Sequence, residues 1–161
     1  AQRHGMVMWD EIFYEVAKNY PQVETQRVLV DAVTTQMVLK PYMLDTFVAT
    51  NLHADILSDL AAALSGSLGI APTANLNPER KFPSMFEPIH GSAFDIAGKG
   101  IANPIATFWT ASMMLEHLGE KEAAAHMMTA IEAVTAKKIH TPDLGGEATT
   151  EIVTSAVCDA L

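Results

Sequence analysis

Two carboxylates at helical spacing are the first side chains in this sequence that could do chemistry. Asp55 and Asp59 are four residues apart, so on a helix both would project from one face, about one turn from each other. Like charges at this spacing repel by roughly a few tenths of a kcal/mol unless a cation compensates them. The pair therefore indicates a candidate site for a hard metal ion, with a solvated helix face as the alternative.

A third carboxylate, Asp31, follows the run Val28-Leu29-Val30 and is expected at the end of a short strand. Together with the helical pair it could give the all-oxygen ligation that suits magnesium or manganese. Zinc would favour histidine or cysteine ligands. His53 is two positions before Asp55 and faces elsewhere on the helix, so it is expected only as a residue of the helix start. The predicted cofactor is Mn²⁺ or Mg²⁺.

The second candidate for chemistry is an irregular segment, residues 87–104, that contains three glycines and ends at a predicted helix N-terminus. Glycines allow backbone N–H groups to approach phosphate or adenine closely. Asp95 in this segment could accept hydrogen bonds from both hydroxyls of a ribose while repelling a 2′-phosphate. The pattern indicates a nucleotide-binding loop, with an ordinary connecting loop as the alternative.

Neither of the common nucleotide fingerprints is present. The sequence contains no G-x-G-x-x-G and no G-x-x-x-x-G-K-[ST], so it excludes an ordinary Rossmann or P-loop site.

The elements that must position these residues follow from hydrophobic periodicity and from proline and glycine. Asn103-Pro104 is typical of a helix start, with an N-cap followed by proline. Helices are predicted at 9–19, 32–39, 53–64, 104–118, 120–138 and 150–161, strands at 28–30, 47–49 and 85–87, and loops at 72–83, 90–103 and 141–146. Alternating strands and helices predict an α/β layered fold.

Composition excludes several classes of partner. The formal net charge is -9 and the basic residues are scattered, so nucleic acid is not expected as a partner. Polar residues interrupt every apolar stretch, so no membrane association is expected and a cytoplasmic location is predicted. The single Cys158 cannot form an internal disulfide and is predicted to be a buried thiol.

Several stretches together resemble the isocitrate and isopropylmalate dehydrogenase family of β-decarboxylating dehydrogenases. They are Asp55-Ile56-Leu57-Ser58-Asp59-Leu60, the whole segment 87–104, Thr50-Asn51-Leu52-His53-Ala54 and residues 80–86. The last two resemble most closely the branch that acts on tartrate and D-malate. The resemblance implies an NAD-dependent oxidoreductase that needs a divalent metal and oxidises, with decarboxylation, a small 2-hydroxy diacid such as tartrate or D-malate.

The resemblance also implies roles for individual residues. Asp31, Asp55 and Asp59 become the metal ligands, with Asp31 contributed across the interface of a homodimer. The NAD site extends over Glu87 near the nicotinamide, His90, Gly91, Ser92 and Ala93 on the adenosine phosphate side, Asp95 and Ile96 at the adenine ribose, and Asn103 near the adenine. The Asp95-Ile96 pair is the one expected of NAD users.

The implied fold is the isopropylmalate dehydrogenase-like layered fold with a mixed sheet, of which this chain is the C-terminal portion. Residues 1–66 are expected to complete a middle, dimer-forming domain, and residues 67–161 to return to the terminal domain with the NAD-binding loop. The catalytic lysine and tyrosine and the substrate-binding arginines are expected to precede Ala1, so the isolated chain is expected to be inactive.

Two alternatives stay open. A fragment of an isopropylmalate or isocitrate dehydrogenase differs only in its substrate. A non-catalytic, dimerising α/β module would use the same carboxylates and loop only as structure.

Overall fold

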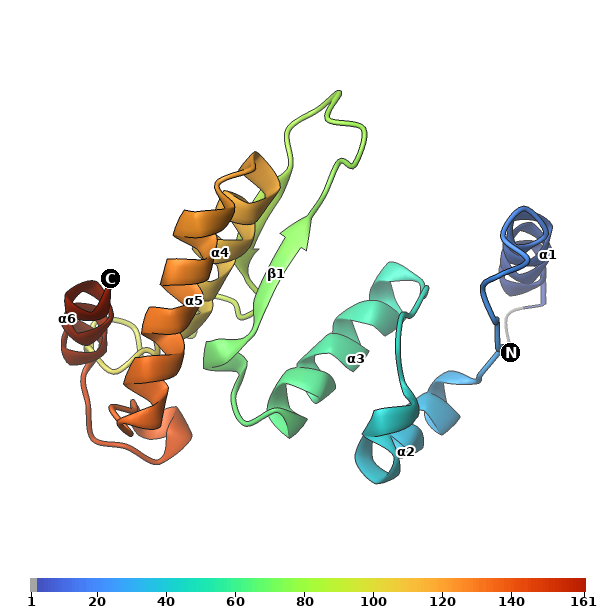
Figure 1. Cartoon of the computed structure of the whole chain (residues 1–161). Helices are drawn as coiled ribbons and strands as arrows, with labels where there is room; N and C mark the ends of the chain where they lie inside the picture. Colours follow the sequence, from blue (N-terminus) through green and yellow to red (C-terminus); the bar gives the residue numbers. More distant parts are fainter. Residues whose placement is uncertain (1–2) are drawn as a thin grey trace. The chain divides into compact units, whose positions relative to one another are not determined.

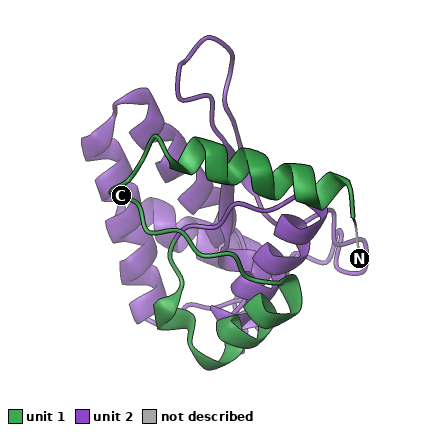
Figure 2. Cartoon of the chain, turned by 90° about the vertical axis from the view of Figure 1, so that its right-hand side faces the viewer, with its two compact units in different colours: residues 1–45 green, residues 46–161 purple. Residues whose placement is uncertain are grey.

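Six α-helices and one pair of β-strands form the part of the chain, residues 3–161, that the computed structural model describes (Figure 1). The chain divides into two compact units, residues 1–45 and 46–161 (Figure 2). The boundary between these units precedes the helix that carries Asp55 and Asp59. The division into a dimer-forming part up to Gly66 and a terminal domain after it stays a prediction.

The first unit contains two helices, α1 (Gly5–Ala17) and α2 (Val30–Leu39), followed by the short 3-10 helix η1 (Pro41–Met43). An ion pair of 2.7 Å joins Arg27 to Asp10 on α1. Among the described residues of this unit, 3–45, only Val33 and Met37, one turn apart on α2, are buried. The helices therefore form as their periodicity predicts, although most of their apolar side chains are exposed.

In the second unit the first element is α3 (Asn51–Leu64), which buries Leu57 and Ala62. Gly66 ends the helix with a φ of +129°, a conformation that residues with a side chain rarely adopt. The short helix η2 (Leu68–Ile70) then leads into the sheet. The predicted helix 53–64 is thus confirmed, with its first residue two positions earlier than expected.

The two strands are β1 (Pro72–Asn75) and β2 (Met85–Pro88), which pair antiparallel with Thr73 opposite Glu87. The connection between them, residues 76–84, extends beyond the neighbouring helices in both views (Figures 1 and 2). Helix α4 packs against both strands. The sheet ends at Pro88, and the glycine-punctuated segment continues from there to the start of α4.

Three helices build the core of the second unit: α4 (Ile105–Leu118), α5 (Lys121–Ala136) and α6 (Thr150–Ala160), with the 3-10 helix η3 (Pro142–Leu144) between the last two. Helix α5 packs against both α4 and α6, and α4 and α5 lie side by side in Figure 1. The buried core comprises Ile105, Ala130, Ile131, Val134, Val153 and Val157. Ile105, which directly follows the glycine-punctuated segment, is part of this core.

Three predictions about the elements are wrong. Residues 28–30 and 47–49 form no strand, and β1 occupies part of the predicted loop 72–83. A strand needs a partner for its backbone groups as well as β-branched residues. Within residues 3–161 only the segment 85–88 offers such a partner, and it pairs with residues 72–75. Residue Leu29 is extended, with ψ 147°, but it is the N-cap of α2 and belongs to no sheet.

The predicted burial of Cys158 is also wrong, because the thiol is exposed. Helix α6 buries Val153 and Val157, which are one turn apart. The residue after Val157 is rotated by about 100° away from that buried face. No helix within residues 3–161 combines the length and the apolar character that crossing a bilayer requires.

Candidate functional site

Helix α3 presents the two carboxylates that the sequence singled out. Asp55 and Asp59 are both exposed, on a helix whose buried residues are Leu57 and Ala62. Within residues 3–161 neither carboxylate accepts a hydrogen bond or forms an ion pair. The Ser58 hydroxyl donates to the backbone oxygen of Asp55 at 2.9 Å, not to its carboxylate. Two anionic oxygen donors one turn apart, with no other partner, are a donor set that a hard divalent cation prefers.

Asp31 lies in the first turn of α2, so its predicted place at a strand end is wrong. Its Oδ1 accepts a hydrogen bond of 2.9 Å from the N–H of Ala32, and its side chain is exposed. The N-terminal turn of a helix favours a carboxylate because the backbone N–H groups point toward it. Asp31 and the α3 pair belong to different units, and within residues 3–161 of one copy no three side chains of metal-binding type are grouped. The role of all three as ligands stays a prediction.

The segment between β2 and α4 forms the irregular loop that was predicted. It contains only short turns, with Ile96 N–H donating to the Ala93 oxygen at 3.0 Å and Lys99 N–H to the Ile96 oxygen at 3.1 Å. Gly98 and Gly100 have φ values of +75° and +67°, which explains the glycines there. We call residues 90–103 the glycine loop.

Most of the predicted nucleotide-binding side chains are exposed on this loop. Glu87 on β2 and the four residues Gly91, Ser92, Ala93 and Asp95 are exposed, whereas His90 and Ile96 are half-buried. The ring Nδ1 of His90 lies 3.0 Å from the Gly91 oxygen. Ala93 has a φ of +42°, a left-handed conformation, and begins the turn that the hydrogen bond from Ile96 N–H to the Ala93 oxygen closes. A dinucleotide bound here would need backbone N–H groups for its phosphates and a carboxylate, that of Asp95, for its ribose hydroxyls.

Asn103 differs from the other loop residues because it is only 8% exposed and both ends of its side chain are engaged. Its Oδ1 accepts a hydrogen bond of 3.0 Å from the N–H of Ile105, and its Nδ2 donates to Asp143 at 2.9 Å. The first of these bonds lies at the start of α4, which begins at Ile105 with Pro104 as its N-cap residue, one position later than predicted.

A cluster of hydrogen bonds around Asp143 was not predicted. One carboxylate oxygen, Oδ2, accepts from Ser67 and Asn103, and the other, Oδ1, accepts from Thr141 at 2.5 Å. We call these four residues the Asp143 cluster. Burial raises the pKa of Asp143, but the hydrogen bonds from Ser67, Thr141 and Asn103 and one from the backbone outweigh it, so the pKa lies below its usual range. The carboxylate is therefore held in its charged form.

Gly69 makes the close packing of this cluster possible. A Cβ added at this position would lie 2.7 Å from the Cβ of Asn103 and 2.8 Å from Oδ2 of Asp143. Its own N–H donates to the Ser67 hydroxyl at 2.9 Å. In the sequence, the members of this cluster are only small or polar residues in separate turns. Hydrogen bonds between residues 76 and 40 positions apart leave no local pattern from which the cluster could be predicted.

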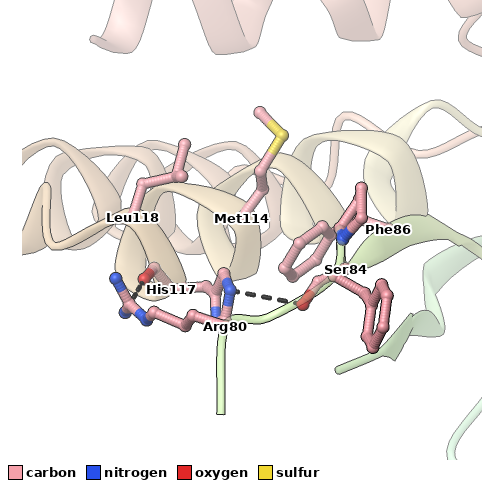
Figure 3. A pocket seen from close by; sticks show the side chains of 8 residues that line it. Arg80, Ser84, Phe86, Met114, His117 and Leu118 are labelled. Carbon is pink, nitrogen blue, oxygen red and sulfur yellow. Dashed lines mark hydrogen bonds between the residues drawn. The ribbon is translucent and has the colours of Figure 1, made fainter. Parts of the chain in front are cut away.

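A shallow pocket of about 370 Å³ lies where residues 80–86 meet the C-terminal half of α4 (Figure 3). Arg80 donates to the His117 oxygen, and the hydroxyl of Ser84 lies 3.3 Å from the ring Nε2 of His117. The rings of Phe86 and His117 are 5.5 Å apart. These contacts hold the connection between the two strands against α4. None of the predicted site residues lines the pocket.

Comparison with known proteins finds a family match and several similar proteins. Residues 3–161 match the family described as isocitrate/isopropylmalate dehydrogenase. The probable tartrate dehydrogenase/decarboxylase TtuC′ of Agrobacterium vitis is 71% identical over 161 residues, which is 100% of this chain and 45% of that protein. The D-malate dehydrogenase (decarboxylating) of Escherichia coli is 51% identical over 96% of this chain and 44% of its own length.

Among solved structures, an isocitrate dehydrogenase from Methylococcus capsulatus superposes with a TM-score of 0.83, at 44% identity over 93% of this chain and 44% of that one. The expected isopropylmalate dehydrogenase-like fold is thereby confirmed. The chain spans less than half the length of the curated relatives it matches.

Proposed function

The chain belongs to the isocitrate/isopropylmalate dehydrogenase family, and from that premise we propose that it is part of an enzyme that oxidises and decarboxylates a small 2-hydroxy diacid, tartrate or D-malate, using NAD and a divalent metal. The observation that carries the proposal is the 71% identity, over the whole chain, to proteins named probable tartrate dehydrogenase/decarboxylase. Sequence identity at this level supports the same substrate class.

The metal site of the proposal rests on the free carboxylates of α3. Asp55 and Asp59 supply two anionic oxygens on one exposed helix face, and Asp31 of the partner subunit completes the set in a homodimer. A bound Mn²⁺ or Mg²⁺ supplies Lewis-acid chemistry both for oxidation of the hydroxyl and for loss of carbon dioxide, and NAD accepts the hydride. All-oxygen ligation fits either ion.

The coenzyme site of the proposal rests on the glycine loop. Residues 91–93 are exposed, and in the proposal their backbone N–H groups approach the phosphates while the exposed Asp95 carboxylate accepts hydrogen bonds from both ribose hydroxyls. A carboxylate at that place repels the 2′-phosphate of NADP, which favours NAD. Glu87, exposed at the end of β2, faces the nicotinamide half in this arrangement.

An isocitrate or isopropylmalate dehydrogenase is the second candidate. It is favoured by the isocitrate dehydrogenase whose structure matches this chain with a TM-score of 0.83 and 44% identity. That identity is lower than the one to the tartrate branch, so we place it second.

A substrate panel tests the proposal in the full-length protein. NADH formation is followed with Mn²⁺ and, in turn, meso-tartrate, D-malate, isocitrate and 3-isopropylmalate. The proposal expects the two small diacids to be used with kcat/KM at least tenfold above the other two substrates. Preference for isocitrate or 3-isopropylmalate would replace the first candidate by the second, and no NADH from any of the four would support the non-catalytic module.

A further inference from the structure

The glycine loop is held at its two ends and not in its middle. At the start, Ile89 N–H donates to the Ala71 oxygen at 3.1 Å beside the strand pair. At the end, Thr150 of α6 donates through its N–H to the Gly100 oxygen at 2.9 Å and through its hydroxyl to the Ala102 oxygen at 2.5 Å. The described hydrogen bonds of residues 91–99 are all made within the loop or to His90. The position of the loop therefore depends on its end contacts.

Asp143 is the centre of the contact at the C-terminal end. Its three side-chain donors come from three separate segments, the turn after α3, the end of the glycine loop and the start of η3. Ser67, Asn103 and Thr141 are 9%, 8% and 1% exposed, so the three donors are largely shielded from water, whereas Asp143 itself is exposed. Hydrogen bonds to an ionised acceptor are also about twice as strong as neutral ones.

The orientation of the Asn103 carboxamide is decided by these partners. A carboxamide carries two N–H donors at one end and one oxygen at the other. Ile105 N–H requires an acceptor and Asp143 requires a donor. Rotating the carboxamide by 180° would exchange its oxygen and nitrogen, so only one of the two orientations satisfies both partners. That orientation leaves the second N–H of Nδ2 with a fixed direction at the end of the glycine loop.

We propose that Asp143 is a positioning residue for nucleotide binding, which fixes the carboxamide of Asn103 and the end of the glycine loop so that the adenosine half of the dinucleotide meets a preformed surface. The inference rests on the proposed role of the glycine loop. Asp143 itself touches no coenzyme in this account. Its removal costs affinity because the bound dinucleotide must then order Asn103 and the loop end.

The test measures binding to the full-length protein by calorimetry, with NAD and with ADP-ribose, which lacks the nicotinamide. Asp143→Ala removes both acceptor oxygens and is expected to raise the Kd of both ligands roughly tenfold. The Kd of Mn²⁺ is expected to change less than about twofold, because the hydrogen bonds of the cluster do not include Asp55 or Asp59. Asp143→Asn keeps one acceptor oxygen, so it is expected to recover part of the loss.

Glu147→Ala is the matched control, since it removes an exposed carboxylate four residues further along the same connection and is expected to leave all three constants unchanged. Equal losses for NAD, ADP-ribose and Mn²⁺ would show a merely structural role and overturn the inference. An unchanged Kd for ADP-ribose in folded Asp143→Ala would overturn it as well.

If Asp143→Ala does not fold, the inference is tested with Asp143→Asn alone. A rise of about threefold in the Kd of ADP-ribose, with that of Mn²⁺ unchanged, supports the inference, and no rise overturns it. Wild-type protein that binds neither NAD nor ADP-ribose would instead contradict the proposed function itself.

Discussion

The side-chain amide of Asn103 donates a hydrogen bond of 2.9 Å to Asp143, which lies 40 residues further along the chain. The contact joins the last residue of the glycine loop to η3, and Ser67 joins the same carboxylate to the turn after α3. The loop that we propose for NAD and the turn that follows the helix we propose for the metal thus share one part-buried set of hydrogen bonds. Both proposals can be tested separately by variants of the full-length protein.

Coenzyme preference is expected to change in Asp95→Lys. A lysine at this position loses the acceptor for the ribose hydroxyls and attracts a 2′-phosphate. We expect the ratio of kcat/KM for NADP to that for NAD to rise roughly tenfold or more. Asp159→Lys, at an exposed position on α6, makes the same change of charge away from the loop and should leave the ratio unaltered. An unaltered ratio in Asp95→Lys would count against this carboxylate as the ribose acceptor.

Acid stability should depend on Asp143. Its pKa in the folded protein lies below the ordinary value of 3.8, so the charged carboxylate stabilises the fold above that value and the contribution is lost as pH falls through the folded pKa. Wild type should therefore be more stable than Asp143→Asn at pH 7, and the difference should shrink below about pH 4. Urea unfolding at pH 7, 5 and 3 measures it, and a difference that grows toward acid would contradict the assignment.

The core between α5 and α6 is expected to respond to truncation at Val153. This side chain is 0% exposed, and Val153→Ala should lower the free energy of unfolding by about 2 kcal/mol through lost burial and a residual cavity. Ile152→Ala, at a position 51% exposed on the same helix, should lower it by less than about 1 kcal/mol. Equal losses for the two variants would show that α6 does not pack as described.

The helices of this protein could be predicted from the sequence because each has its own signals. Asn103 and Pro104 mark the start of α4, and Gly119, with a φ of +97°, marks its end. The exposed pair on α3 followed from spacing alone, since residues four apart on a helix share a face.

The strands and the Asp143 cluster could not be predicted in the same way. Residues 28–30 and 72–75 differ in whether another segment offers a backbone partner, which the residues themselves do not reveal. Asp143 follows a threonine and a proline in what reads as an ordinary turn. Its partners Ser67 and Asn103 are brought to it only by tertiary packing, in which η2 packs against α3 and α4. Family resemblance supplied the roles of the loop residues, and it gave no sign of this carboxylate.

The most direct test of the account is the effect of Asp59→Asn on Mn²⁺ binding and on NADH formation from D-malate in the full-length protein. The substitution keeps the shape of the side chain and removes one anionic ligand, so we expect the Kd of Mn²⁺ to rise at least tenfold and turnover to fall to background, with the unfolding transition unchanged. Glu132→Gln, which neutralises an exposed carboxylate on α5, should alter neither. Full turnover and unchanged Mn²⁺ affinity in Asp59→Asn would contradict the proposed metal site.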